Sequence, residues 1–314
     1  MPPANRHQPR RSDASESRYS LMEFMRDLPD DATCLEWLWT TRYAPDGKHA
    51  DCPKCELRRE FKRYDTSQQR QSWTCTACGF HLHPTAGTIF HKSSTSLHLW
   101  FYAMYLMTST RCGISAKQLE RELGVTYKTA WRMFTLIRNE LMVDDDEPLS
   151  GAVEADETYV GGKRRKGKTG RPGRGDRKKT PVFGMVERGG QVVASKVPDA
   201  SAMSLMPQIE KRVLPESVVY TDEWRGYGRL ERSGYQHRRI HHAQEIWVMG
   251  DVHTNTIEGF WSLVKRGIAG THHAVSAKWL QGYLNEYAWR YNHRDDGQAM
   301  FLTLLLRSAT TTTL

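Results

Sequence analysis

Hydrophobic and polar positions change their spacing along this chain, and each change predicts a different kind of element. Residues 19–43 read as two short helices separated by Pro29, and residues 94–115 form a strongly apolar stretch that predicts a core helix. Apolar residues then recur at helical spacing on both sides of Gly124, which predicts two helices joined by a turn. From about residue 151 the pattern alternates, which is typical of strands.

The alternating half predicts a mixed α/β sheet. The stretch GAVEADETYVGG predicts a strand, and the stretch around Gly189 and Gly190 predicts a hairpin. A helix over SAMSLMPQIEKRVL follows, and then a strand over SVVYTDEW that ends in an acid. The order hairpin, helix and strand is typical of an α/β domain.

The two helices around Gly124 have the spacing of a helix-turn-helix. Their apolar positions are Ile114, Leu119, Leu123, Val125, Ala130, Phe134, Ile137 and Leu141. A second helix opening at Thr126 would present Lys128 and Arg132, with Tyr127 and Thr129, to a major groove. An ordinary helical hairpin has the same spacing, so this pattern alone leaves both interpretations open.

Composition and charge narrow the class of protein. The 314 residues are 39% hydrophobic, enough for two or three domains with cores of their own. No apolar run has membrane-spanning length, and the N-terminus lacks the apolar centre of a signal peptide, so we expect a cytoplasmic protein without a membrane partner. The formal net charge of +9 favours a polyanionic partner such as nucleic acid, although a basic solvated surface would have the same charge.

Four of the six cysteines form two pairs with metal-ligand spacing. Cys52 and Cys55 lie in CPKC, and Cys75 and Cys78 lie in CTAC. The spacing C-x2-C-x19-C-x2-C predicts a structural zinc site with the intervening residues in a β-hairpin. Disulfides are disfavoured in a reducing compartment. The other two cysteines, Cys34 and Cys112, read as small buried hydrophobes.

Three acids lie where a carboxylate needs compensation. Asp156 lies within a predicted strand, and Asp222 lies at the end of another. A carboxylate buried there without a partner would be strongly destabilising, and Mg²⁺ or Mn²⁺ is the hard cation that oxygen ligands suit. Glu258, on the helix predicted for HTNTIEGFWSLVKRG, supplies a third carboxylate.

The sequence resembles the DDE transposases of bacterial insertion sequences, in the group that joins an N-terminal zinc ribbon to a ribonuclease H-like catalytic domain. The resemblance covers most of the chain from Cys52 to Arg294. It is carried by the paired C-x2-C, VEADETYVGGK, VYTDEWRGY and HTNTIEGFWSLVKRGIAGTHHAVSAKWLQGYLNEYAWRYNHR.

This resemblance implies that Asp156, Asp222 and Glu258 form a metal-binding catalytic triad. It also implies that water is the first nucleophile and that the exposed 3′-hydroxyl then attacks target DNA. Some relatives use Asn as the third member, so Asn255 is kept as a neighbour that orients a ligand or contacts DNA. His253 and the pair His241 and His242 are candidates to assist near the scissile phosphate, but we favour the alternative that they are surface or core histidines.

A basic segment contains the letters of a phosphate-binding P-loop. GKRRKGKT, Gly162–Thr169, follows a strand as a P-loop must, but the proline and glycines after it prevent the required helix. We therefore interpret the segment as a basic arm that contacts the DNA backbone through Arg164, Arg165 and Lys166. A solvated hairpin tip without a role is the alternative.

Together these patterns predict a multidomain α+β protein. The expected parts are a basic tail (1–18), a short helical segment (19–48), a zinc ribbon (49–90), a helix-turn-helix region (91–142), an acidic linker (143–150) and a ribonuclease H-like DDE catalytic domain (151–314). The expected function is a nucleoid-associated DNA transposase with structural Zn²⁺ and catalytic Mg²⁺ or Mn²⁺. It would act on terminal inverted repeats and target DNA as a homodimer or higher oligomer. A metal-dependent nuclease and a non-catalytic DNA-binding regulator are the alternatives.

Overall fold

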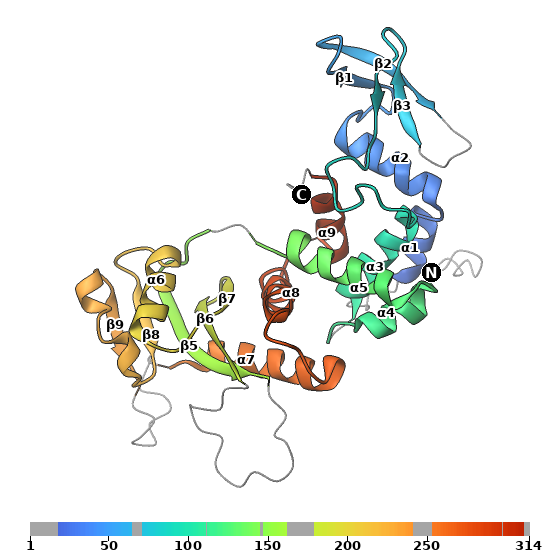
Figure 1. Cartoon of the computed structure of the whole chain (residues 1–314). Coiled ribbons are helices and arrows are strands. Elements are labelled where there is room, and N and C mark those ends of the chain that lie inside the picture. The colour runs from blue at the N-terminus through green and yellow to red at the C-terminus, as the bar shows by residue number, and fades with distance from the viewer. Residues whose placement is uncertain are drawn as a thin grey trace, which may run out of the picture. The chain divides into compact units, whose positions relative to one another are not determined.

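The chain folds as two compact units. The computed structural model describes residues 18–64, 71–110, 112–144, 147–161, 179–240, 253–296 and 298–310 (Figure 1). The first unit is built from described residues within 1–111, 116–141 and 296–314, and the second from those within 112–115 and 142–295. Among the described residues, no helix has the length and apolar character needed to cross a membrane.

The first unit opens with the two predicted helices. Helix α1 (Leu21–Asp27) begins at a capping box in which the Ser20 and Glu23 side chains each bond the other residue's backbone N–H. Helix α2 (Asp31–Arg42) is capped by Asp30. The prediction of two short helices separated at Pro29 is confirmed.

A four-stranded antiparallel sheet follows α2. Its strands, in order across the sheet, are β1 (His49–Cys52), β2 (Leu57–Tyr64), β3 (Ser72–Cys75) and β4 (His81–Leu82). The expected hairpin between the cysteine pairs is therefore present, as β2 and β3. This sheet is too small to bury a core of its own. Instead, Trp73 stacks on Trp39 of α2 with 4.7 Å between ring centroids, and Phe61 packs beside them.

The rest of the first unit is helical. Helix α3 (Leu97–Ser109) buries seven of its thirteen residues, as its apolar sequence predicts. Helix α4 (Ala116–Leu123) ends at Gly124, whose φ of +62° allows the chain to turn into α5 (Tyr127–Leu136). Thr126 caps α5, and a π-helical turn (Ile137–Leu141) continues it. The predicted helix pair is present and packs on α3.

The last helix belongs to the first unit. Helix α9 (Met300–Ser308) packs on α3, with Phe301 and Tyr105 in edge-to-face contact at 5.7 Å. The catalytic domain was expected to run to residue 314, but the chain returns to the first unit at about residue 296. The reason is the apolar character of α9, which buries Phe301, Leu304 and Leu305 and packs Phe301 against Tyr105 of α3.

A five-stranded mixed sheet forms the centre of the second unit. Its strands are β5 (Ala152–Val160), β6 (Thr180–Glu187), β7 (Val192–Lys196), β8 (Val218–Thr221) and β9 (Gln236–Arg239). The order across the sheet is β7-β6-β5-β8-β9, with β5, β6 and β7 antiparallel in sequence and β8 and β9 parallel to β5. The first four strands match predicted ones, whereas β9 was not predicted.

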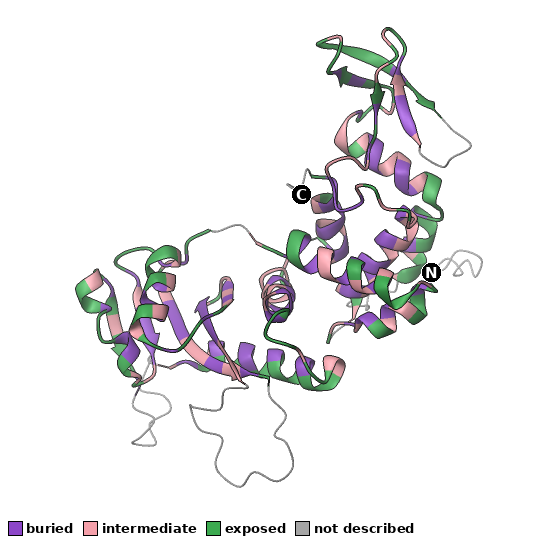
Figure 2. Ribbon diagram, in the orientation of Figure 1, coloured by how far each residue is buried: buried purple, intermediate pink, exposed green. Residues whose placement is uncertain are grey.

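Helices cover both faces of this sheet, so the central strands β5 and β6 bury side chains on both sides, whereas the edge strand β9 stays largely exposed (Figure 2). Helix α6 (Ala202–Arg212) packs on the face that carries Val153 and Ala155. Helices α7 (Asn255–Gly267) and α8 (Leu280–Asn292) pack on the other face, against residues such as Val182. Short 3₁₀ turns (Arg225–Tyr227 and Glu231–Ser233) and a π turn (Ile268–His272) complete the unit.

The segment expected to be an acidic linker is partly integrated into the second unit. Asp144 accepts hydrogen bonds from Asn292 Nδ2 at 2.8 Å and lies 3.1 Å from His293 Nε2. Leu149 is buried and forms a bridge with Val213. Of this segment, the structure leaves only residues 145 and 146 outside its description.

Helix α7 approaches the sheet closely at Gly184. An added Cβ there would lie 2.5 Å from Trp261 and 3.0 Å from Ile257, both on α7. We therefore predict that Gly184→Ala destabilises the protein by about 1–3 kcal/mol in urea unfolding, because overpacking displaces α7. Gly259→Ala is the control: its Cβ meets nothing within 4 Å, so it should leave stability unchanged or raise it. Equal stability of Gly184→Ala and wild type would contradict this account of the contact.

Candidate active site

Asp156 and Asp222 are brought level by the parallel pairing of β5 and β8. Ala152 pairs with Val218 and Glu154 with Tyr220, so the same register continues to place Asp156 beside Asp222, just beyond the end of β8. Neighbouring strands lie about 4.8 Å apart, and residues in register on parallel strands point to the same face. The two carboxylates therefore share one face of the sheet.

That face is the one covered by α7. Asp156 pairs with Gly184, against which Trp261 and Ile257 of α7 pack. Glu258 lies in the first turn of the same helix, and its carboxylate accepts a hydrogen bond of 3.0 Å from the Thr254 hydroxyl. Asn255, the other candidate for the third position, is the exposed first residue of α7.

The pKa of Asp156 is sensitive to the acids that lie around it. Burial, followed by the charges of Glu157, Asp222 and Glu258, raises the pKa of Asp156 to about 7. Asp222 and Glu258 therefore both lie within electrostatic reach of Asp156. Sequence reasoning identified these residues from their places on strand, strand and helix.

Two hydrogen bonds fix the side chains of Asp222 and of Glu157, the acid next to Asp156. The Trp224 backbone N–H donates to Asp222 Oδ1 at 2.9 Å, and the buried Tyr227 hydroxyl donates to Glu157 Oε2 at 2.6 Å. Burial and the Glu157 carboxylate raise the pKa of Tyr227 well above its ordinary value, so the phenol stays protonated and remains the donor. Glu157, next to Asp156, is thereby held on the face of the sheet that α6 covers.

Sequence reasoning missed a further acid of this region, Glu154. Its side chain is fully buried and accepts hydrogen bonds from the backbone N–H groups of Thr256 at 2.9 Å and Ile257 at 3.0 Å. The Thr256 hydroxyl donates to it at 3.0 Å and Arg188 Nε at 2.8 Å. His253 Nδ1 lies 3.2 Å away. The alternation E-x-D along β5, which puts both acids on one face, was the available signal.

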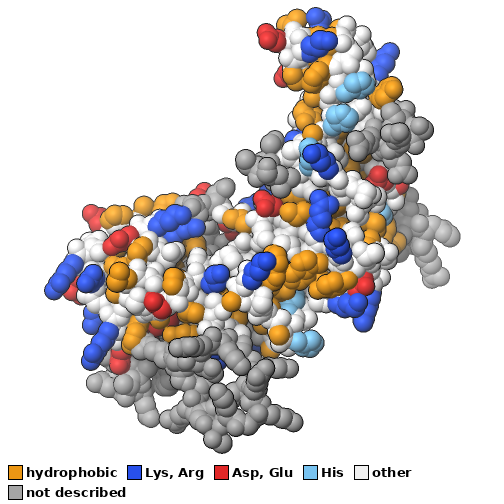
Figure 3. Space-filling view, viewed as in Figure 1, with side chains coloured by type: hydrophobic (Ala, Val, Ile, Leu, Met, Phe, Trp, Pro, Cys, Tyr) orange, Lys and Arg blue, Asp and Glu red, His pale blue; other side chains and the backbone are white. Residues whose placement is uncertain are grey.

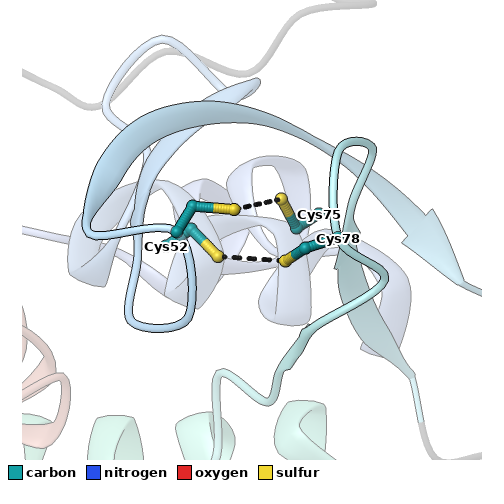
Figure 4. Close-up of side chains that lie close together, drawn as sticks. Cys52, Cys75 and Cys78 are labelled. Atoms are coloured by element: carbon teal, nitrogen blue, oxygen red, sulfur yellow. Dashed lines mark hydrogen bonds between the residues drawn. The ribbon is translucent and has the colours of Figure 1, made fainter.

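The four predicted cysteine ligands also come together (Figure 4). Their sulfur atoms all lie within 4.8 Å of one another, with Cys52 Sγ 3.5 Å from Cys78 Sγ and Cys55 Sγ 4.0 Å from Cys75 Sγ. A zinc–sulfur bond of about 2.3 Å in a tetrahedron requires sulfur atoms about 3.8 Å apart. The cluster thus has the spacing of a four-thiolate site.

Local turns build this cluster. In each knuckle the residue after the second cysteine has positive φ, Glu56 at 53° and Gly79 at 72°. Its N–H then bonds the carbonyl of the first cysteine, at 2.8 Å for Cys52 and 2.9 Å for Cys75. Both turns are closed by backbone bonds, so each knuckle presents its two thiols in the same way. Cys34 is buried as expected, but Cys112 is exposed, because it lies in the turn before α4 and not in a helix.

The carboxylates are spaced more widely than the thiols. Among the described residues, only the four cysteines place three or more ligand atoms within 4.8 Å. Even so, the acids fit a divalent cation: their donors are hard oxygens, and the pKa of Asp156 is raised by burial and by neighbouring negative charge that a cation would compensate.

The other predicted residues divide between described and undescribed parts of the chain. Lys128 and Arg132 are exposed on α5, as the predicted contact with a major groove requires. Arg164, Arg165 and Lys166 lie outside the described residues, as do His241 and His242. Their roles stay predictions.

The β9 edge carries a basic surface that the sequence reasoning did not identify. Within residues 225–239 five arginines are exposed: Arg225, Arg229, Arg232, Arg238 and Arg239. Lys and Arg side chains project at this edge of the unit (Figure 3). Thr221 of β8 pairs with Arg239 of β9. This basic surface therefore lies beside the residue that immediately precedes Asp222.

Comparison with known proteins decides the family. Residues 148–292 match the ISXO2-like transposase domain. The chain is 32% identical over 272 residues to an uncharacterized protein in transposable element ISH50 of Halobacterium salinarum, an alignment that covers 81% of this chain and 90% of that protein. The chain belongs to the ISXO2-like transposase family.

Other similarities of this transposase-family chain are more limited. An uncharacterized transposase-like protein of Haemophilus influenzae is 32% identical over 99 residues, which cover 32% of this chain and 79% of that protein. A pre-cleavage Mos1 transpososome is 12% identical with a TM-score of 0.26, covering 68% of this chain and 79% of that one. A simian T-cell lymphotropic virus intasome chain is 14% identical with a TM-score of 0.31, covering 65% and 74%.

The raised pKa of Asp156 predicts how stability depends on pH. The folded pKa of about 7 lies above the ordinary value of 3.8, so the folded state binds the proton more tightly and stability falls as pH rises between those two values. Asp156→Asn removes the charge. In thermal unfolding with EDTA it should stabilise the protein at about pH 8 and have little effect at about pH 4.

Asp199→Asn is the control of opposite sign for this prediction. Hydrogen bonds from Ser201 lower the pKa of Asp199, so its charge stabilises the fold above its ordinary pKa, and its loss should bring no gain at pH 8. A pH-independent effect of Asp156→Asn would contradict the assignment.

Proposed function

We propose that this chain is a DDE-class DNA transposase that cleaves at the terminal inverted repeats of an insertion sequence and joins the ends to target DNA. The proposal is supported by the register that sets Asp156 beside Asp222 and by the place of Glu258 in the first turn of α7, from where its charge raises the pKa of Asp156, in a chain of a transposase family.

We also propose that the second unit is a ribonuclease H-like domain. Three strands that are antiparallel in succession, followed across the sheet by two strands parallel to the first, support this assignment. So do the helices on both faces of the sheet. In this arrangement the acids lie at the carboxyl end of β8, where a substrate can approach the edge of the sheet.

Asp156, Asp222 and Glu258 would hold Mg²⁺ or Mn²⁺ through carboxylate oxygens. A bound pair of such ions supplies positive charge at the attacking and leaving oxygens of an in-line phosphoryl transfer. The protein residues fix where that charge lies: the sheet register sets the two aspartates, and Thr254 orients Glu258. Trp224 and the segment after β8 orient Asp222.

The proposed DNA partner is supported by basic surfaces on both units. Exposed Lys128 and Arg132 on α5 suit base recognition, and the α4–α5 turn suits a helix-turn-helix. The arginines of the β9 edge, beside Asp222, suit phosphate contacts close to the reacting bond. A dimer or larger assembly on DNA remains part of the proposal.

We propose one structural zinc ion in the four-thiol cluster of the first unit. Zinc would offset the small core of the β1–β4 sheet, because its binding energy is also folding energy.

The catalytic proposal predicts that Asp156→Ala, Asp222→Ala and Glu258→Ala each abolish cleavage and joining of a terminal-repeat duplex in Mg²⁺ while leaving DNA binding intact. Glu223→Ala, an exposed acid beside Asp222, is the matched control and should stay active. Asn255→Ala should reduce activity less than Glu258→Ala. Gel assays separate the alternatives: cleavage without joining indicates a nuclease, and binding alone indicates a regulator. Activity in Asp156→Ala would exclude the proposal.

The zinc proposal predicts about one zinc per chain in metal analysis of purified protein. Cys75→Ser should lose the metal and unfold the β1–β4 sheet, because a buried ligand is removed. Cys112→Ser changes an exposed thiol outside the cluster and should retain both zinc and fold. Folded wild-type protein without zinc would refute the site.

The DNA contacts predict two kinds of loss. Lys128→Ala with Arg132→Ala should weaken binding to terminal repeats more than to random duplex. Arg238→Gln with Arg239→Gln should weaken both alike and reduce the salt-dependence slope by up to about 2, as loss of phosphate contacts does. The same uniform loss is expected for Arg164 and Arg165. Lys196→Gln with Lys278→Gln, which remove two exposed charges near the β7 edge, should leave binding unchanged. Equal losses from every pair would remove the base-reading role of α5.

A further inference from the structure

Glu154 connects the strand of one proposed metal ligand to the helix of another. It precedes Asp156 by two residues on β5, so both side chains lie on the face that α7 covers. Its carboxylate receives the N–H groups of Thr256 and Ile257, at the beginning of the helix whose next residue is Glu258. The side chain of the helix's own N-cap residue, Thr254, makes no capping bond.

Arg188 extends this connection to the rest of the sheet. Its Nε donates to Glu154 at 2.8 Å and its Nη2 donates to the His253 carbonyl at 2.7 Å, just before α7. Its guanidinium also lies 4.0 Å over the ring of Tyr220 on β8, two residues before Asp222. Elements that carry all three proposed ligands therefore meet at the Glu154–Arg188 pair.

We propose that Glu154 is a positioning residue that holds Glu258 at the distance from Asp156 and Asp222 that divalent-cation binding requires. This inference rests on the proposed function. Glu154 itself is too enclosed to be a ligand, because its oxygens are fully buried and used by Thr256, Ile257 and Arg188. A charged acceptor here also matches the positive end of the α7 dipole.

The test compares Glu154→Gln with a matched buried acid. Glu286 of α8 is also fully buried and also pairs with an arginine, Arg290, four residues further along its own helix. Glu286→Gln therefore controls for general destabilisation. Thr256→Val removes only the hydroxyl contact to Glu154 and is a milder variant that should remain folded.

Mn²⁺ affinity is measured by calorimetry, and the Mg²⁺ concentration for half-maximal single-turnover cleavage is measured on a terminal-repeat duplex. Glu154→Gln should weaken Mn²⁺ binding by about 10–100-fold and raise the Mg²⁺ requirement in parallel, as loss of a residue that orients a ligand does. Thr256→Val should shift both in the same direction by less. Glu286→Gln should leave both within about two-fold of wild type, well below the shift expected when an orienting residue is lost.

Failure of the positioning role and failure of the proposed function give different results. Unchanged Mn²⁺ affinity in Glu154→Gln and Thr256→Val, or an equal loss in Glu286→Gln, would overturn the positioning role. Wild-type protein that binds no Mn²⁺ and cleaves no duplex would instead refute the proposed function. In that case hydrogen exchange at Thr256 and Ile257 still tests the contact: exchange that is no faster in Glu154→Gln than in Glu286→Gln overturns it.

Discussion

The second unit depends on one buried carboxylate that joins elements far apart in the sequence. Glu154 and Thr256 are separated by about a hundred residues, yet the fully buried Glu154 carboxylate accepts hydrogen bonds from both the backbone N–H and the hydroxyl of Thr256. A buried charge of this kind is tolerated only when its acceptor positions are filled, so the contact selects one placement of α7 on the sheet. Gly184 sets the same placement sterically from the neighbouring strand.

This placement of α7 brings Glu258 to the face of the sheet that carries Asp156 and Asp222. Asp156 has a raised pKa because it is buried beside like charges, which is unfavourable for folding at neutral pH. The Trp224 N–H holds Asp222 and the Thr254 hydroxyl holds Glu258, whereas Tyr227 holds Glu157 on the opposite face of the sheet. The charges of Asp222 and Glu258 act on Asp156, and a cation bound at the proposed site would compensate them.

Much of the fold could be predicted from local pattern. The two capped helices at Pro29, the apolar helix α3, the turn at Gly124 and the strands around Asp156 and Asp222 all follow from periodicity and turn residues. Strand β9 could not be predicted, because its sequence QHRR shows no alternation of apolar and polar residues. The strand lies at the edge of the sheet and is largely exposed, so it needs none. The return of α9 to the first unit is a long-range packing outcome that no local pattern encodes.

The candidate sites differ in how much the sequence alone could determine. The cysteine cluster is specified locally, because each C-x2-C knuckle is closed by its own backbone turn and only the β2–β3 hairpin is needed to join them. The acidic residues depend on sheet register. The sequence could therefore nominate these residues, but it could not predict how closely they approach one another. Glu154 shows most clearly what the sequence alone could not determine, because in sequence it is only another acid in VEADE. The pairing of β5 with β8 and the packing of α7 distinguish its buried role from that of Asp156. A motif therefore identifies chemistry when its geometry is local, whereas nonlocal geometry must be read from the fold.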